Sequence, residues 1–127
     1  MRSRLFAVVS AAVLLASCGR SHEGAKPPSA TPAEIDFALR AEPSPPALKA
    51  LFDRSCKNCH GVAGNGAPLV GQTSAWAPRI AARGPEGLLA SVKTGRNAMP
   101  PRGLCPDCTD DDYRAIIAFM SAKPAPL

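Results

Sequence analysis

Apolar residues recur at helical spacing in several short stretches of the chain, and the clearest stripe lies near its C-terminus. Tyr113, Ile116, Ile117 and Met120 are separated by three, one and three positions, and residues spaced in this way lie on one face of an α-helix. Thr109 stands where a helix cap belongs, and the three aspartates that follow it favour the positive end of the helix dipole. The pattern predicts a C-terminal helix with one buried face, and it favours helix-start charges over a metal site for the aspartates.

Four shorter stretches also predict helices, separated by proline and glycine. They cover about 31–40, 47–59, 73–80 and 85–94. We expect Ser44 to cap the second of these, with Pro45 at its first position, and Thr73 or Ser74 to cap the third. Gly95 stands where a glycine commonly ends a helix. The sequence therefore predicts an all-α fold built from short helices.

Length and charge narrow the class of protein. The chain has 127 residues, which suits one small domain with tails. Its formal net charge is +5, but Arg2 and Arg4 belong to an N-terminal targeting segment, and from Cys18 onward 13 basic residues face 10 acidic ones. The sequence contains no arginine-rich run and no platform of aromatic and basic residues, so it argues against nucleic-acid binding. A domain of ~80 residues has a thin core, which a covalent cofactor would reinforce.

The N-terminal segment predicts export and a lipid anchor. Residues 1–17 begin with a short positive stretch and continue with an apolar stretch too short to span a bilayer comfortably. The sequence Leu-Ala-Ser before Cys18 looks like the lipobox of bacterial lipoproteins, in which the cysteine is lipidated and becomes the new N-terminus. An ordinary signal peptide cut nearby is the alternative. We expect a signal peptide over 1–17, a lipidated N-terminus, flexible tether and short helix over 18–43, and a folded domain over 44–127.

The motif that best indicates a chemical function is residues 56–60, which read Cys-Lys-Asn-Cys-His. C-x-x-C followed directly by histidine is the attachment signature of c-type haem. Two thiols that add across the vinyl groups of a haem must lie about one helical turn apart, as Cys56 and Cys59 would on a helix. The next residue, His60, would then lie under the ring and give an imidazole nitrogen to the iron. A redox C-x-x-C that happens to precede a histidine and half of a zinc site are the alternatives.

Met99 is the candidate for the second axial ligand of the iron. It lies in residues 96–103, which we expect to form an extended loop because two prolines follow Met99 and hold it away from helical geometry. A methionine in a proline loop without apolar neighbours is poorly explained as core. Met120, by contrast, lies on the helical stripe and is expected in the core.

Three further residues are candidates for contacts within the haem site. The carbonyl of Pro68 would accept the second imidazole N–H of His60, although a simple turn proline explains that residue equally well. Trp76 is expected either in the core or as a donor of its indole N–H to a buried acceptor such as a propionate. Arg79 would pair with the other propionate, with a solvated surface charge as the alternative.

Cys105 and Cys108 form a second C-x-x-C. A zinc ribbon would pair them with Cys56 and Cys59, but the haem motif already uses that pair and an exported chain lies in an oxidising compartment. These arguments favour a disulfide that pins the Met99 loop to the last helix, with a reversible redox switch as the alternative.

Together these pieces resemble class I cytochrome c, and specifically the bacterial cytochrome c5 type, over about 47–120. The matching segments are Cys56-x-x-Cys59-His60, Gly61-Val62-Ala63-Gly64, Trp76-x-Pro78-Arg79-Ile80, Ala98-Met99-Pro100-Pro101-x-Gly103 and Cys105-x-x-Cys108. The cysteine pair beside the methionine loop is the feature that singles out the c5 type. The resemblance implies an all-helical fold wrapped around one covalent haem c, with His60 and Met99 as axial ligands and single-electron transfer as the activity. Methionine ligation favours ferrous iron and raises the reduction potential.

Three functions are compatible with this resemblance. The first is a membrane-tethered carrier that faces the periplasm or the cell exterior and passes electrons to a terminal oxidase or reductase. The second is a dedicated haem subunit docked on a periplasmic dehydrogenase. The third, a peroxidase or gas sensor, would require Met99 to leave the iron. We expect redox proteins as partners, no small-molecule substrate and no catalytic residue.

Overall fold

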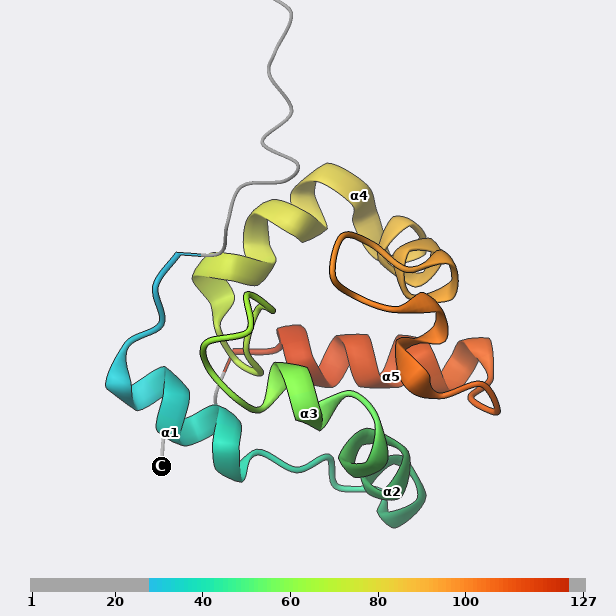
Figure 1. Ribbon diagram of the computed structural model, residues 1–127, viewed down its shortest axis with the longest axis horizontal. Coiled ribbons are helices and arrows are strands. Elements are labelled where there is room, and N and C mark those ends of the chain that lie inside the picture. Colours follow the sequence, from blue (N-terminus) through green and yellow to red (C-terminus); the bar gives the residue numbers. More distant parts are fainter. Residues whose placement is uncertain (1–27, 124–127) are drawn as a thin grey trace, which may run out of the picture.

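The computed structural model describes residues 28–123, and within them the chain is all-α, as the sequence predicted (Figure 1). Its elements are α1 (Pro32–Arg40), α2 (Pro46–Arg54), α3 (Lys57–His60), α4 (Thr73–Thr94), a 3-10 turn η1 (Pro101–Leu104) and α5 (Asp110–Ser121). The predicted signal peptide, Cys18 and most of the predicted tether lie outside the described residues. Within 28–123 no helix is long and apolar enough to cross a membrane.

Capping boxes begin the first and last helices. In α1 the Thr31 hydroxyl accepts from the Glu34 N–H and the Glu34 carboxylate accepts from the Thr31 N–H. Thr109 and Asp112 form the same reciprocal pair at α5. These boxes satisfy backbone donors that the first turn of a helix leaves without partners. The expected roles of the Thr109 cap and of the aspartates as helix-start charges are confirmed.

The prediction of one helix over 47–59 was wrong, because Ser55 interrupts it. Ser55 has φ −130° and ψ −76°, and its hydroxyl donates to the carbonyl of Leu51 at 2.6 Å. A serine side chain bonded to the preceding turn competes with the backbone ladder. The haem motif therefore occupies its own short helix, α3, in a new direction. Ser44 does not cap α2 either; Pro45 is the N-cap and makes no side-chain hydrogen bond.

The two helices expected over 73–80 and 85–94 form one element, α4, with a sharp break at Gly84. That residue has φ 62° and ψ 178°, a conformation open mainly to glycine, and Pro85 begins the second part. The N-cap is Gln72, not Thr73 or Ser74. The break allows α4 to arch over one side of α5 in Figure 1, while α1, α2 and α3 lie on the other side.

The stripe on α5 is the centre of the core. Tyr113, Ile116, Ile117 and Met120 are all buried. Ile116 and Met120 belong to an apolar cluster that includes Phe52 of α2, Trp76 of α4 and Ala38 of α1. Tyr113 and Ile117 belong to a second cluster with the end of α4 and both cysteines of the second C-x-x-C. The residues of α1 are thus part of the folded core and not of a free tether.

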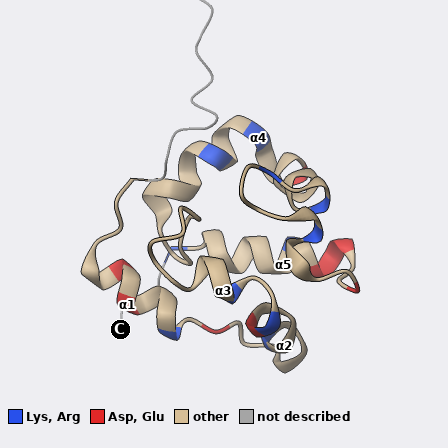
Figure 2. Ribbon diagram, in the orientation of Figure 1, with Lys and Arg blue, Asp and Glu red and all other residues tan. Residues whose placement is uncertain are grey.

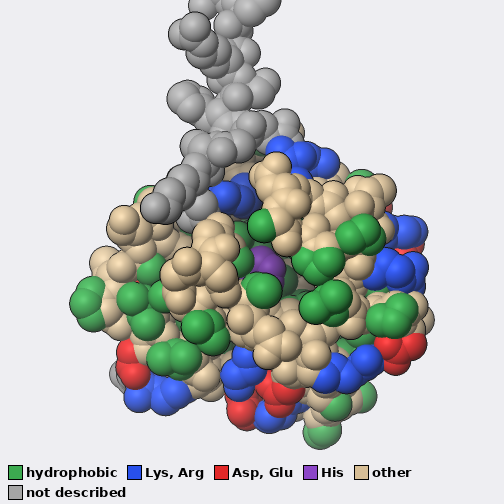
Figure 3. Space-filling view, viewed as in Figure 1, with side chains coloured by type: hydrophobic (Ala, Val, Ile, Leu, Met, Phe, Trp, Pro, Cys, Tyr) green, Lys and Arg blue, Asp and Glu red, His purple; other side chains and the backbone are tan. Residues whose placement is uncertain are grey.

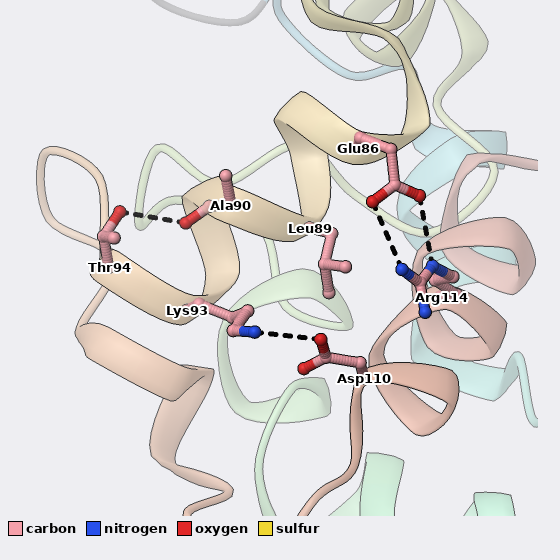
Figure 4. A pocket seen from close by; sticks show the side chains of 7 residues that line it. All are labelled: Glu86, Leu89, Ala90, Lys93, Thr94, Asp110 and Arg114. Carbon is pink, nitrogen blue, oxygen red and sulfur yellow. Dashed lines mark hydrogen bonds and ion pairs between the residues drawn. The ribbon is translucent and has the colours of Figure 1, made fainter.

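Ion pairs connect the second half of α4 with the first half of α5 at the surface. A hollow of about 330 Å³ lies there, and the two ion pairs on its rim join Lys93 to Asp110 at 2.9 Å and Arg114 to Glu86 at 3.2 Å (Figure 4). Figure 2 shows the acidic start of α5 next to basic positions of neighbouring segments. Exposed pairs of this kind contribute little to stability, because solvent screens their charges. We read this hollow as a solvated contact between helices.

Candidate functional site

A cavity of about 740 Å³ opens between α3, α4, α5 and the loop after α4. It is lined by both cysteines of the haem motif, by His60 and by Met99, and most of its remaining wall is apolar. Figure 3 looks into this hollow, with green hydrophobic side chains around its opening and a purple histidine inside. Its size lies within the range of ~300–1,000 Å³ that small-molecule and cofactor sites usually have.

Helix α3 brings the three residues of the haem motif together. The Cys56 carbonyl accepts the backbone N–H of Cys59 at 3.2 Å and of His60 at 2.9 Å, so the five residues close one helical turn. Cys56 is half-buried and Cys59 is exposed, and both are free thiols. Burial raises the pKa of the Cys56 thiol. Both cysteines border the cavity, as thiols that are to be joined to one planar ligand must.

His60 is buried and oriented by a backbone carbonyl. Its Nδ1 lies 2.7 Å from the carbonyl oxygen of Pro68. Because a carbonyl can only accept, Nδ1 carries the proton and Nε2 keeps a lone pair for a metal. Burial lowers the pKa of His60, so the ring is neutral, as a ligand must be. The ring of Trp76 stacks beside it, with centroids 5.8 Å apart.

Trp76 lies in the core, as predicted, and its indole N–H has a buried acceptor, which is a backbone carbonyl. The indole Nε1–H donates to the carbonyl of Leu69 at 2.8 Å, and the side chain is buried. Trp76 still lines the cavity, so it acts as a wall and as a neighbour of the histidine ring.

Arg79 lines the cavity, as expected for a partner of an anionic group. One of its guanidinium nitrogens donates to the carbonyl of Ala75 at 2.6 Å, which fixes the side chain along its own helix. Burial lowers the pKa of Arg79, and the positive charge of nearby Arg96 adds to that effect. Arg83 and Arg96 border the same cavity, so three cationic side chains surround it. Neither Arg83 nor Arg96 was predicted from the sequence, because no motif includes them.

Met99 lies on a tight turn and not on an extended loop. Its backbone N–H and C=O pair with those of Arg96 at 2.9 and 3.0 Å. The following residues form the 3-10 turn η1, in which Arg102 and Gly103 have positive φ. The Met99 methyl group lies close to Gly103, where a Cβ would stand 3.5 Å from it. The residue is half-buried, borders the cavity and packs against the second apolar cluster.

Cys105 and Cys108 are joined to each other by a disulfide directly after the methionine loop. The Tyr113 hydroxyl donates to the Cys105 carbonyl at 2.6 Å, which connects this turn to α5. Arg102 donates to the carbonyls of Pro106 and Cys108 at 2.8 and 3.1 Å. The pair therefore lies between the Met99 turn and the last helix, as predicted.

The residues around the cavity fit a covalently attached haem. Two free thiols lie one turn apart, a neutral imidazole keeps its Nε2 lone pair, and a thioether borders the same space. The apolar wall suits a macrocycle and the arginines suit its propionates. One further buried polar residue, Gln72, supports the histidine side and was not found from the sequence, because its burial depends on contacts with residues far along the chain.

Comparisons with known proteins agree with this site. The sequence model of the family described as cytochrome C oxidase, cbb3-type, subunit III matches residues 43–120. The chain is 46% identical over 72 residues to cytochrome c5 of Ectopseudomonas mendocina, covering 56% of this chain and 83% of that protein.

Two solved structures have the same fold. A mono-haem ferrocytochrome c from Shewanella putrefaciens is 51% identical with a TM-score of 0.51, over 61% of this chain and 94% of that one. The cytochrome c in a crystal structure of an electron transfer complex with nitrite reductase is 39% identical with a TM-score of 0.53, over 61% and 93% of the two chains. Residues 43–120, which the family model matches, contain the haem motif, the methionine turn and the second cysteine pair.

Proposed function

The chain belongs to the class I c-type cytochromes of the cytochrome c5 kind, and we propose that it is a membrane-anchored electron carrier whose covalent haem has His60 and Met99 as axial ligands. That it is a monohaem electron carrier and not an enzyme follows from the family. The ligand pair is our proposal, supported by one observation above all: a single cavity brings together Cys56, Cys59, His60 and Met99.

Each of these residues has a separate role. Cys56 and Cys59 would hold the haem through thioether bonds, and the bound haem supplies a centre that takes up and releases one electron. His60, oriented by Pro68, would present Nε2 to the iron. Met99 would fill the other axial position, which leaves no open site for a substrate. Arg79 would neutralise a propionate from the cavity wall.

The anchor and the location are part of the same proposal. Cys18 would carry the lipid after removal of residues 1–17, and the tether would hold the domain at a bacterial membrane facing the periplasm or the cell exterior. Two or more acyl chains are needed for firm attachment. Metabolic labelling with a radioactive fatty acid tests this: label is expected on the native chain and is expected to be lost in Cys18→Ser. Label retained in Cys18→Ser would contradict the anchor.

The partners would be redox proteins that meet the cavity side of the domain. A similar cytochrome c forms an electron transfer complex with nitrite reductase, which supports a terminal reductase as one class of acceptor. The matching family description names an oxidase subunit, which supports a second arrangement, permanent docking on a larger redox enzyme. Sedimentation of the detergent-extracted native protein separates the two, because a carrier sediments near its own mass and a docked subunit with its enzyme.

The ligand pair is tested by the optical spectra of the oxidised and reduced holoprotein in wild type, Met99→Ala and Met120→Leu. Met120 is a matched control, since it is a buried methionine that borders the same cavity. We expect a low-spin c-type spectrum with a methionine-to-ferric charge-transfer band in wild type and Met120→Leu, and loss of the band in Met99→Ala. A band that survives in Met99→Ala, or a high-spin wild type, would overturn the proposed ligation.

A further inference from the structure

Gln72 is the most deeply buried polar side chain that the haem motif does not explain. Its exposed fraction is 1%, and burying an amide is unfavourable unless its atoms find partners. Both ends are satisfied. The side-chain oxygen accepts the backbone N–H of Leu69 at 3.1 Å, and the side-chain nitrogen donates to the carbonyl of Pro28 at 2.8 Å.

The N–H that Gln72 accepts belongs to the same peptide group whose carbonyl orients His60. That group joins Pro68 to Leu69: its oxygen accepts from Nδ1 of His60 at 2.7 Å, and its N–H donates to Gln72. Nitrogen, carbon and oxygen of a peptide are conjugated, so an acceptor on the N–H moves electron density to the oxygen. Hydrogen bonds linked in this way strengthen one another. Gln72 therefore makes the Pro68 carbonyl a better acceptor.

The chain of hydrogen bonds has a fixed start and a second support. It begins at the Pro28 carbonyl, passes through the Gln72 amide and the 68–69 peptide, and ends on the imidazole of His60. The carbonyl of Leu69 takes the indole N–H of Trp76, whose ring stacks on His60. Pro28 lies outside residues 43–120, where the family sequence model matches. The segment before α1 thus takes part in orienting the site.

We propose that Gln72 is a positioning residue that tunes the reduction potential of this cytochrome, by strengthening the hydrogen bond between His60 and the Pro68 carbonyl. The proposal rests on the ligand role proposed above for His60. A stronger acceptor on Nδ1 makes Nε2 a stronger donor to the iron, which stabilises the ferric state and lowers the potential. The Pro28 carbonyl holds the Gln72 amide in the orientation that the effect needs.

The test is a redox titration of the full-length holoprotein in wild type, Gln72→Leu, Gln72→Met and Thr31→Ala. Leu and Met keep side-chain volume but remove both polar ends. We expect both Gln72 variants to shift the midpoint potential to more positive values. At a fixed ambient potential the ferric-to-ferrous ratio should change several-fold. This is less than the ~10–100-fold change in affinity or activity that follows the loss of a group bonded directly to a metal ligand. Thr31→Ala removes the cap of α1 but leaves the chain of hydrogen bonds intact, so its potential is expected to match wild type.

The charge-transfer band is recorded on the same samples, so that two failures are distinguished. A wild type without the band means that the proposed ligation has failed. A wild type and Gln72 variants that keep the band, with unchanged potentials, overturn the role of Gln72 alone. An equal shift in Thr31→Ala, or a failure of both Gln72 variants to incorporate haem, also overturns it, because the role of Gln72 would then be structural.

Discussion

His60 and Met99 border one cavity, but the chain holds them in different ways. The histidine ring is fixed by a hydrogen bond to the Pro68 carbonyl and by the stacked ring of Trp76. The Met99 turn is instead positioned by its backbone pair with Arg96 and by the disulfide that follows. A thioether is a weak acceptor, so its position depends on the path of the backbone that carries it.

The two loops also differ in their backbone conformations. In residues 61–71 the positive-φ positions are glycines: Gly64, Gly66 and Gly71. In residues 95–104 three non-glycine residues share that conformation: Asn97, Arg102 and Leu104. Positive φ is unfavourable for a residue with a side chain; the left-handed helical conformation costs ~1–2 kcal/mol per residue. The histidine loop thus follows local preference, whereas the methionine loop is held against it by contacts with the rest of the fold, and we expect the methionine side to loosen first.

The largest expected effect on the methionine turn comes from Gly95→Ala, with Gly66→Ala as its control in the histidine loop. Both glycines have φ +79°, but a Cβ on Gly95 would stand 2.9 Å from the Met99 oxygen and the Pro101 nitrogen, whereas one on Gly66 meets nothing within 4 Å. We expect Gly66→Ala to lower the free energy of unfolding by roughly 1–2 kcal/mol. Gly95→Ala adds an overlap with backbone, roughly 1–3 kcal/mol more, and weakens the charge-transfer band.

Chemical denaturation followed at the Soret and charge-transfer bands measures both effects. Equal losses in the two variants would show that the methionine turn has room to relax. Gly66→Ala is expected to keep the band, so a weakened band there would mean that the histidine loop controls the methionine as well.

Removing the disulfide is expected to have an intermediate effect. Closing so short a loop contributes about 2 kcal/mol by chain entropy. Both sulfurs are buried under α5, so Cys105→Ala with Cys108→Ala is expected to keep the fold and the covalent haem but to weaken the charge-transfer band. Tyr113→Phe is the matched control, since it removes only the hydrogen bond to the Cys105 carbonyl. A band as strong in the double variant as in wild type would contradict the pinning role of the disulfide.

The smallest expected effect is a loss of stability on the methionine side as the pH is lowered. The pKa of Asp107 is lowered by its hydrogen bond with Arg54, that of Asp110 by Lys93, and that of Asp112 by the Thr109 cap. A carboxyl group whose pKa is lower in the folded than in the unfolded protein stabilises the fold at pH values above the unfolded pKa, about 4. This stabilisation is lost as the pH falls through the pKa of the folded state.

Asp110 and Asp112 lie in the first turn of α5, and Asp107 lies between the two disulfide cysteines that follow the methionine turn. We therefore expect the charge-transfer band to weaken in acid before the low-spin Soret band changes, as measured by a pH titration of the ferric protein. Asp112→Asn removes one of these groups and should make the pH dependence of stability shallower. An unchanged pH profile in that variant would show that the cap carboxylate is not coupled to folding.

Much of the fold and of the site followed from the sequence because it depends on near neighbours. The stripe from Tyr113 to Met120, the cap at Thr109 and the start of a helical stretch at Pro85 are local patterns, and the structure contains each of them. The C-x-x-C-H motif identifies its chemistry by spacing alone. No spacing rule connects Met99 to residues 56–60; it became a candidate because two prolines follow it, and the resemblance to cytochrome c5 implied the same ligand.

The sequence did not determine which hydrogen-bond partners the buried polar groups have in the folded chain. Trp76 bonds to the Leu69 carbonyl, Ser55 turns back on Leu51 and ends α2, and Gln72 is buried between Leu69 and Pro28. A buried donor must find an acceptor, but the sequence does not say which of the carbonyls nearby will accept, and the Pro28 carbonyl that Gln72 reaches is 44 residues away in the chain. The sequence alone therefore determined the all-α class, the buried stripe of the last helix and the haem motif. Only the tertiary structure decided where α2 ends, which groups orient the histidine and which hold the methionine turn in place.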